Sequence, residues 1–190
     1  MLKRIAVQVS LLVTIVVLAA CAELGRAPAG KAFELELQGR IALRYGTEGG
    51  NARISWRHSV STDDMLITSA LGQGIARITR DGAEINLITA DGKEYQAANA
   101  ETLTESVLGW PLPLAGLPDW VLGRPGQGRP AQLRRDDSGQ VSAIAQDGWN
   151  IDYLAWREAL PARINMRHDG FQGRGAIEIR LVIDQIKSGL

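Results

Sequence analysis

The sequence contains very little cysteine and no long basic block. Cys21 is the single cysteine among 190 residues, which excludes an internal disulfide and a cysteine-rich zinc site. Basic and acidic residues balance at 21 each, so a nucleic-acid or other polyanionic partner is poorly supported. A chain of this length is expected to form one domain around one hydrophobic core.

Catalytic motifs are also missing. The sequence has no G-x-S-x-G, no H-E-x-x-H and no P-loop. The two histidines, His58 and His168, fall near the ends of different expected strands. They could form a catalytic or metal-binding pair with Asp63 or Asp169, but we favour solvated histidines at strand ends. We therefore expect no catalytic residue, no metal site and no enzymatic activity.

The N-terminus explains the cysteine. Lys3 and Arg4 precede an almost wholly apolar run from Ile5 to Ala20, and Leu-Ala-Ala-Cys ends at Cys21. This pattern predicts an export signal over residues 1–20. Leu-Ala-Ala-Cys resembles the lipobox of bacterial lipoproteins, whose cysteine carries a diacylglycerol thioether and, after cleavage, an N-acyl chain. Cys21 is thus the predicted lipidation site. An uncleaved transmembrane helix is the alternative, although the run falls near the lower length limit for spanning.

The predicted mature chain has a short tether followed by one domain. Residues 21–32 are small, polar and contain proline and glycine, as in a flexible tether, and residues 33–190 form the domain. No later apolar run approaches transmembrane length, so we expect this domain to sit on a membrane without crossing it. Ala22 follows the cysteine. By analogy with enterobacterial lipoproteins, an aspartate there would favour retention in the inner membrane.

Alternation of apolar and polar residues dominates the domain. Over residues 33–45, apolar residues take odd positions and polar residues even ones, which predicts a strand with one buried face and a bend or bulge at Gly39. Gly49-Gly50 and four Asp-Gly pairs, at Asp81, Asp91, Asp147 and Asp169, are predicted turns. Further strands are predicted at about 52–57, 65–69, 75–80, 83–89, 94–96, 131–135, 140–146, 149–154, 163–168 and 175–183.

One irregular apolar segment, Gly109–Gly126, interrupts these strands. Asn99 is a predicted N-cap for a helix that ends at Leu108, and a second short helix is expected at about Leu117–Leu122. The predicted fold class is mainly β: an open antiparallel β-barrel, or half-barrel, of about eleven strands. A helical lid, at about residues 98–125, is expected over a hydrophobic cavity.

The chain has five tryptophans but only two phenylalanines. An apolar pocket with a few aromatic side chains would suit an acyl chain, whereas simple filling of the core is the alternative. The candidate residues of an acyl-chain cavity and its lid are Trp56, Trp110, Leu117, Trp120 and Trp149.

Several segments together resemble the outer-membrane lipoprotein receptor family LolB. They are F-x-L-x-G-R-I near Phe33–Ile41 with variations in spacing, the tryptophan of the second strand, L-I-T-S-A-L-G at Leu66–Gly72, D-G-K-E-Y-x-A at Asp91–Ala97, L-G-W-P-L-P-L-x-x-L-x-x-W-x-x-G-x-P at Leu108–Pro125, W-x-I-x-Y at Trp149–Tyr153 and Leu160-Pro161. The resemblance covers nearly the whole mature chain. Its most specific part is Leu108–Pro125.

The resemblance implies an open β-barrel that accepts acylated lipoproteins from the periplasmic carrier LolA and inserts them into the inner leaflet of the outer membrane. It implies no nucleotide, metal or other cofactor, apart from the acyl groups on Cys21. It also implies attachment to the outer membrane on its periplasmic side. We expect a monomer, although the sequence itself is silent on the oligomeric state. Transfer from one apolar cavity to another requires only a difference in affinity, so we expect it to be independent of an energy source.

Two further residues carry hypotheses. In the family, the leucine of the loop that matches Ser69–Gly74 protrudes and helps to insert cargo into the membrane, which implies this role for Leu71; a leucine folded back over the barrel rim is the alternative. Ala70 replaces the usual proline, so the loop is expected to be less rigid than in relatives. For Arg40 we favour a surface salt bridge over a contact that fastens the lid.

Two other classes of function remain open. A lipid-anchored binding module for a free small apolar ligand would use the same barrel, lid and tryptophans. A lipid-processing hydrolase would need a nucleophile with a base, such as His58 or His168. Fold alone does not separate a receptor from a simple binding protein.

Overall fold

The computed structural model describes residues 33–170 and 175–189. The described residues belong to one compact unit, Phe33–Leu190. The predicted signal peptide, the lipidation site Cys21 and the tether lie outside the described residues and stay predictions. Within the described part of the chain, no helix is long and apolar enough to cross a membrane.

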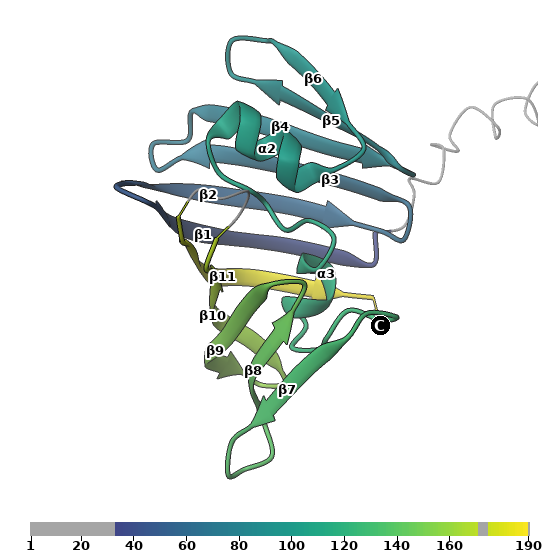
Figure 1. Cartoon of the computed structure of the whole chain (residues 1–190). Helices are drawn as coiled ribbons and strands as arrows, with labels where there is room; N and C mark the ends of the chain where they lie inside the picture. Colours follow the sequence, from purple (N-terminus) through teal and green to yellow (C-terminus); the bar gives the residue numbers. More distant parts are fainter. Residues whose placement is uncertain (1–32, 171–174, 190) are drawn as a thin grey trace, which may run out of the picture. The chain divides into compact units, whose positions relative to one another are not determined.

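A single antiparallel sheet contains every strand of the described residues (Figure 1). It has eleven strands in the order β6-β5-β4-β3-β2-β1-β11-β10-β9-β8-β7, so β6 and β7 are its two free edges. The predicted open, mainly antiparallel β fold is confirmed. The strands are β1 (Leu35–Tyr45), β2 (Glu48–His58), β3 (Thr62–Ser69), β4 (Gly74–Asp81), β5 (Glu84–Thr89), β6 (Glu94–Ala97), β7 (Ala131–Arg135), β8 (Val141–Gln146), β9 (Trp149–Arg157), β10 (Leu160–His168) and β11 (Ile177–Ser188).

Two helices in the described part of the chain, α2 (Ala100–Leu108) and α3 (Leu117–Trp120), lie over the same face of this sheet (Figure 1). We call this the inner face and the opposite one the outer face. In β1 the side chains of Leu35, Leu37 and Ile41 are buried on the inner face, whereas Glu36 and Arg40 are exposed on the outer face. The period of two therefore separates the core from solvent as predicted, because successive side chains of a strand point to opposite faces.

Gly39 lies at a β-bulge, as predicted. The register between β1 and β11 shifts between Gln38 and Gly39, which leaves Asp184 as the extra residue of β11. A Cβ atom at Gly39 would lie 2.6 Å from the carbonyl oxygen of Val182, so only glycine fits this close approach. The neighbouring Arg40 forms a two-pronged salt bridge with Asp184, at 2.8 and 3.1 Å. This confirms the predicted surface salt bridge.

Two turns differ from the predictions. Gly49 and Gly50 do not turn the chain; they are paired within β2, opposite Arg44 and Leu43. The turn lies before them, at Gly46-Thr47. Gly46 has a φ of 58°, and this conformation favours glycine. The β9–β10 hairpin is also longer than predicted. It turns at Glu158, which has a φ of 56°, a conformation that the sequence alone did not signal.

The Asp-Gly pairs take different places in their hairpins. Asp147 and Gly148 both have positive φ, 54° and 80°, and form a two-residue turn of the predicted kind. Asp81 instead pairs with Glu84 as the last residue of β4, so that Gly82 begins the turn. Asp91-Gly92 lies in a longer loop between β5 and β6. Asp169-Gly170 precedes residues 171–174, which lie outside the described part.

Candidate functional site

The lid consists of residues 98–125 and contains both helices. Asn99 caps α2 as predicted, since its side chain accepts a hydrogen bond from the Thr102 amide at 2.8 Å, and Gly109 ends the helix in the left-handed conformation. The second helix, α3, ends at Trp120, earlier than the predicted Leu122. The amides of Leu122 and Gly123 bond to carbonyls three residues back rather than four, so the last turn is tighter than an α-helix.

Apolar side chains of the lid are buried against the inner face of the sheet. All five residues predicted to form the acyl-chain cavity and lid, Trp56, Trp110, Leu117, Trp120 and Trp149, belong to one buried cluster. The rings of Trp120 and Trp149 contact each other, with centroids 6.4 Å apart. In this conformation the lid's own side chains cover the inner face. An acyl chain would therefore have to displace them.

The first lid helix is attached to the sheet by two carboxyl groups. Tyr45, at the end of β1, donates a hydrogen bond to Glu105 at 2.9 Å, and Trp149 of β9 donates to Glu101 at 3.3 Å. Glu105 is buried, and burial raises the pKa of the Glu101 carboxyl. These two hydrogen bonds join α2 to the sheet in addition to the apolar contacts of Ala100 and Leu103.

The second lid helix is held by β8 and β9. Trp120 donates its indole hydrogen to Gln146 at 2.9 Å, and the amide of Gly126 donates to the same Gln146 oxygen at 2.8 Å. Tyr153 donates to the carbonyl of Trp120 at 2.8 Å, and burial raises the pKa of its hydroxyl. Packing is tight here, because a Cβ atom at Gly116 would lie 2.2 Å from the Trp120 ring.

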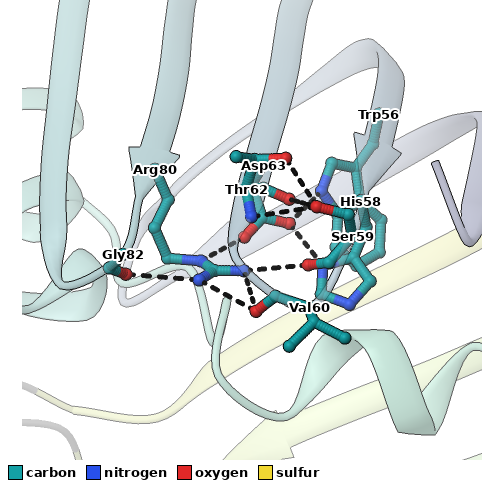
Figure 2. Close-up of polar contacts among 8 residues, drawn as sticks. All are labelled: Trp56, His58, Ser59, Val60, Thr62, Asp63, Arg80 and Gly82. Atoms are coloured by element: carbon teal, nitrogen blue, oxygen red, sulfur yellow. Dashed lines mark hydrogen bonds and ion pairs between the residues drawn. The ribbon is translucent and has the colours of Figure 1, made fainter. Parts of the chain in front are cut away.

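A buried charged network lies at the end of β2, β3 and β4 (Figure 2). Asp63 is only 4% exposed. It accepts hydrogen bonds from Trp56 and His58, each at 2.8 Å, and forms an ion pair with Arg80. Arg80 also donates to carbonyls of the β2–β3 turn, including that of Ser59 at 3.2 Å. Asp63 was named in the sequence as a possible histidine partner, and it does contact His58, but its contacts with Trp56 and Arg80 were not predicted. Its position in the strand carries a signal for burial, since it shares the inward phase of Met65 and Ile67.

The two histidines do not form a pair. His58 lies opposite Leu35 in the β1–β2 register, whereas His168 lies opposite Ile177, which pairs with Tyr45 at the other end of β1. The interpretation of both as solvated is also wrong. His58 is half-buried on Asp63, and His168 stacks edge-on against Trp149, with centroids 5.4 Å apart. Among the described residues, no group of three His, Cys, Asp or Glu side chains could hold a metal ion.

Leu71 is 90% exposed at the tip of the β3–β4 hairpin. It is not folded back onto the sheet. Three hydrogen bonds close the loop: Ser69 amide to Gln73 carbonyl at 2.7 Å, Gly72 amide to Ser69 carbonyl at 2.9 Å, and Gln73 amide to the Ser69 hydroxyl at 3.2 Å. The lower rigidity expected from Ala70 stays a prediction.

Comparison with known proteins identifies the family. The sequence model of the family "Outer membrane lipoprotein LolB" matches residues 34–185. The chain belongs to the LolB family. The outer-membrane lipoprotein LolB of Thiobacillus denitrificans is 39% identical over 153 residues, which cover 80% of this chain and 79% of that protein. The LolB of Dechloromonas aromatica is 35% identical over 189 residues, 94% of this chain and 96% of that protein.

Among solved structures, a LolA superfamily protein from Nitrosomonas europaea aligns with 80% of this chain and 86% of its own, with a TM-score of 0.48 and 13% identity. LolB membership makes this chain an outer-membrane protein that serves in lipoprotein localization, as the resemblance implied. Leu71 and the buried lid tryptophans all fall within the LolB match, at residues 34–185. Their individual roles stay predictions.

Proposed function

We propose that this LolB protein accepts acylated lipoproteins from the periplasmic carrier LolA and inserts them into the inner leaflet of the outer membrane. One observation carries the proposal: a helical lid with an apolar inner side covers the inner face of an open sheet. A small closed barrel could fill its interior with strand side chains alone, whereas the inner face of this open sheet needs a cover. A separate lid, joined to the sheet partly by side-chain hydrogen bonds, suits an inner face that binds an apolar ligand when the lid opens.

Acyl-chain uptake then requires the lid to leave the sheet. Displacement of Trp110, Leu117 and Trp120 exposes apolar area on both the lid and the sheet, and exposure of such area costs about 25 cal/mol per Å². An entering acyl chain covers the same area, so the cost of opening is offset by the cargo. The carrier's cargo moves to this protein when the affinity here is higher, without nucleotide hydrolysis.

The remaining parts of the proposal concern the membrane. Acyl groups on Cys21 would anchor the chain to the periplasmic side of the outer membrane, since several buried chains hold far more firmly than one. Leu71 would enter the lipid surface and release the cargo there, which its exposure supports. No step needs a catalytic residue, a metal or another cofactor. One protein molecule suffices for the transfer.

A transfer experiment tests the function directly. The full mature chain is reconstituted in liposomes and mixed, without ATP, with a complex of LolA and a tri-acylated lipoprotein. We expect the lipoprotein to float with these liposomes and to stay with LolA when the liposomes are empty. If folded protein binds free fatty acid but leaves the lipoprotein on LolA, the chain is a binding module for a free apolar ligand instead.

A further inference from the structure

The outer face of the sheet contains a pocket that acyl-chain transfer does not use. It has a volume of about 610 Å³ and lies across β2, β1, β11 and β10. Its polar lining includes four arginines and two asparagines, and none of the residues that line it is acidic. The arginines are Arg40, Arg53, Arg163 and Arg180. They converge because Arg53 pairs with Arg40, and Arg163 lies opposite Val182, the partner of Arg40 on the other side.

Two of the four arginines already have partners. Arg40 is paired with Asp184, and Arg180 with Glu178 at 2.8 Å. Arg53 and Arg163 have no side-chain partner among the described residues. The pocket therefore has an excess of two positive charges. A guanidinium without a carboxylate partner is well suited to a phosphate group, which it can bind with two parallel hydrogen bonds.

Asn165 provides an independent indication of a ligand. It lines the pocket from β10, and its side-chain oxygen is buried without a hydrogen-bond partner. Buried polar atoms without partners are rare in folded proteins. Rotation of the amide exchanges its oxygen for its NH₂ group, which would then donate to an anion between the arginines. The nearest carboxylate in the register, Asp152, is already paired with Arg134 at 3.3 Å.

Apolar side chains border this pocket on two sides. Ala70 lines it and is followed by the exposed Leu71, and Leu66 and Ile75 are exposed on the same β3–β4 hairpin. Leu154, which lines the pocket from β9, is 57% exposed. Such a border favours a lipid over a nucleic acid. A nucleic acid would need an extended basic track, but Arg57 and Arg77 nearby both pair with Asp64.

We propose that this outer pocket binds the phosphodiester headgroup of an anionic phospholipid and thereby holds the β3–β4 hairpin, with Leu71, against a lipid surface. The site goes beyond transfer of acyl chains, because it acts on membrane lipid rather than on cargo. Headgroup binding on the outer face would set the orientation of the protein, so that Leu71 enters the leaflet instead of projecting along it.

The test uses the full mature chain in a non-ionic detergent and three water-soluble probes: glycerophosphoglycerol, glycerophosphocholine and inorganic phosphate. Calorimetry should detect saturable binding of glycerophosphoglycerol that is tighter than that of the other two. The double variant Arg53→Gln/Arg163→Gln should bind it at least about tenfold more weakly, because it loses charge-assisted hydrogen bonds. A control with the same change in charge outside the pocket, Arg57→Gln/Arg134→Gln, should bind it normally.

Three results would overturn the proposal. Inorganic phosphate that binds as tightly as glycerophosphoglycerol would make the pocket a site for free phosphate. Equal losses in both double variants would mean unspecific attraction, and no saturable binding would mean no site. Asn165→Asp is a further check, since a negative charge there should abolish binding while the urea midpoint shows that the sheet is folded. Failure of cargo transfer with headgroup binding intact would contradict the proposed function alone.

Discussion

Asp63 is a buried carboxylate with three side-chain partners. Its carboxylate holds Trp56, His58 and Arg80 together while it is almost completely buried. Removal of one partner from a buried ion pair typically costs about 3–5 kcal/mol, because the other charge is left without compensation. We therefore expect Asp63→Ala to lower the free energy of unfolding by roughly that amount in urea, with an unchanged m-value.

Asp64 supplies a matched control for this prediction. It is the next residue of β3 but pairs with Arg57 and Arg77 on the outer face. Exposed ion pairs contribute about 0–1 kcal/mol, so Asp64→Ala should have a small effect. Similar losses in the two variants would show that the buried network has no special role in stability.

Leu71 is expected to act in membrane insertion without contributing to stability. Because its side chain is 90% exposed, Leu71→Glu should change the free energy of unfolding by less than about 0.5 kcal/mol. Cargo should still leave the carrier, but its insertion into liposomes should fall, since a carboxylate is costly to place in lipid. Protease protection of the cargo measures insertion. Normal insertion by a folded variant that binds cargo would contradict the role.

Residue-level prediction from sequence succeeded where strand phase was enough. The phase of β1 placed Arg40 on the outer face, where its salt bridge is found. It did not reveal that Arg40, Arg53 and Arg163 share one pocket, because that depends on which strands are neighbours. Pairing of β1 with β11, across nearly the whole domain, is not encoded in local alternation.

At the scale of elements, the lid depends on two glycines at points of close approach. A Cβ atom at Gly116 would overlap the Trp120 ring, and one at Gly123 would lie 2.4 Å from Trp156. Insertion of a methyl group into such packing costs about 1–3 kcal/mol. Gly116→Ala should thus destabilise the domain by that amount and speed amide exchange in α3, whereas Gly50→Ala, which meets open space, should do neither.

Local signals predicted the first lid helix better than the second. Asn99 and Gly109 fixed both ends of α2, because caps are local interactions. For α3 the proline and glycine signals indicated the region, but they did not show how soon the helix would tighten after Trp120. That depends on the bond that Tyr153 donates to the Trp120 carbonyl and the bond that Trp120 donates to Gln146, and both partners lie far away in the sequence. The positions of the β1–β2 and β9–β10 turns were also predicted incorrectly, because local turn signals did not show how far the paired strands extend.

Over the whole molecule, acidity should affect stability in two opposite ways. Burial raises the pKa of Glu101 above its ordinary value of 4.5, so the folded state binds its proton more tightly than the unfolded state. This contribution is complete below pH 4.5 and is lost as the pH rises through the folded pKa. Ion pairs lower the pKa of Asp64 below 3.8, so its contribution is present above pH 3.8 and lost on further acidification.

We therefore expect the melting temperature to rise on mild acidification from neutral pH and to fall below about pH 3.8. Glu101→Gln should flatten the rise, because an amide can still accept the hydrogen bond from Trp149 but does not titrate. Calorimetric scans of the two proteins across this range would measure the effect. An unchanged slope in the variant would mean that another group causes the rise.

The topology also constrains when the chain can fold. β1 and β11, the first and last strands of the described residues, lie side by side in the middle of the sheet, and each half of the sheet is attached to one of them. The two halves can join only after β11, Ile177–Ser188, has been synthesised. A nascent chain therefore cannot join the two halves of its sheet until β11 has left the ribosome, however early the β2–β6 half has been synthesised.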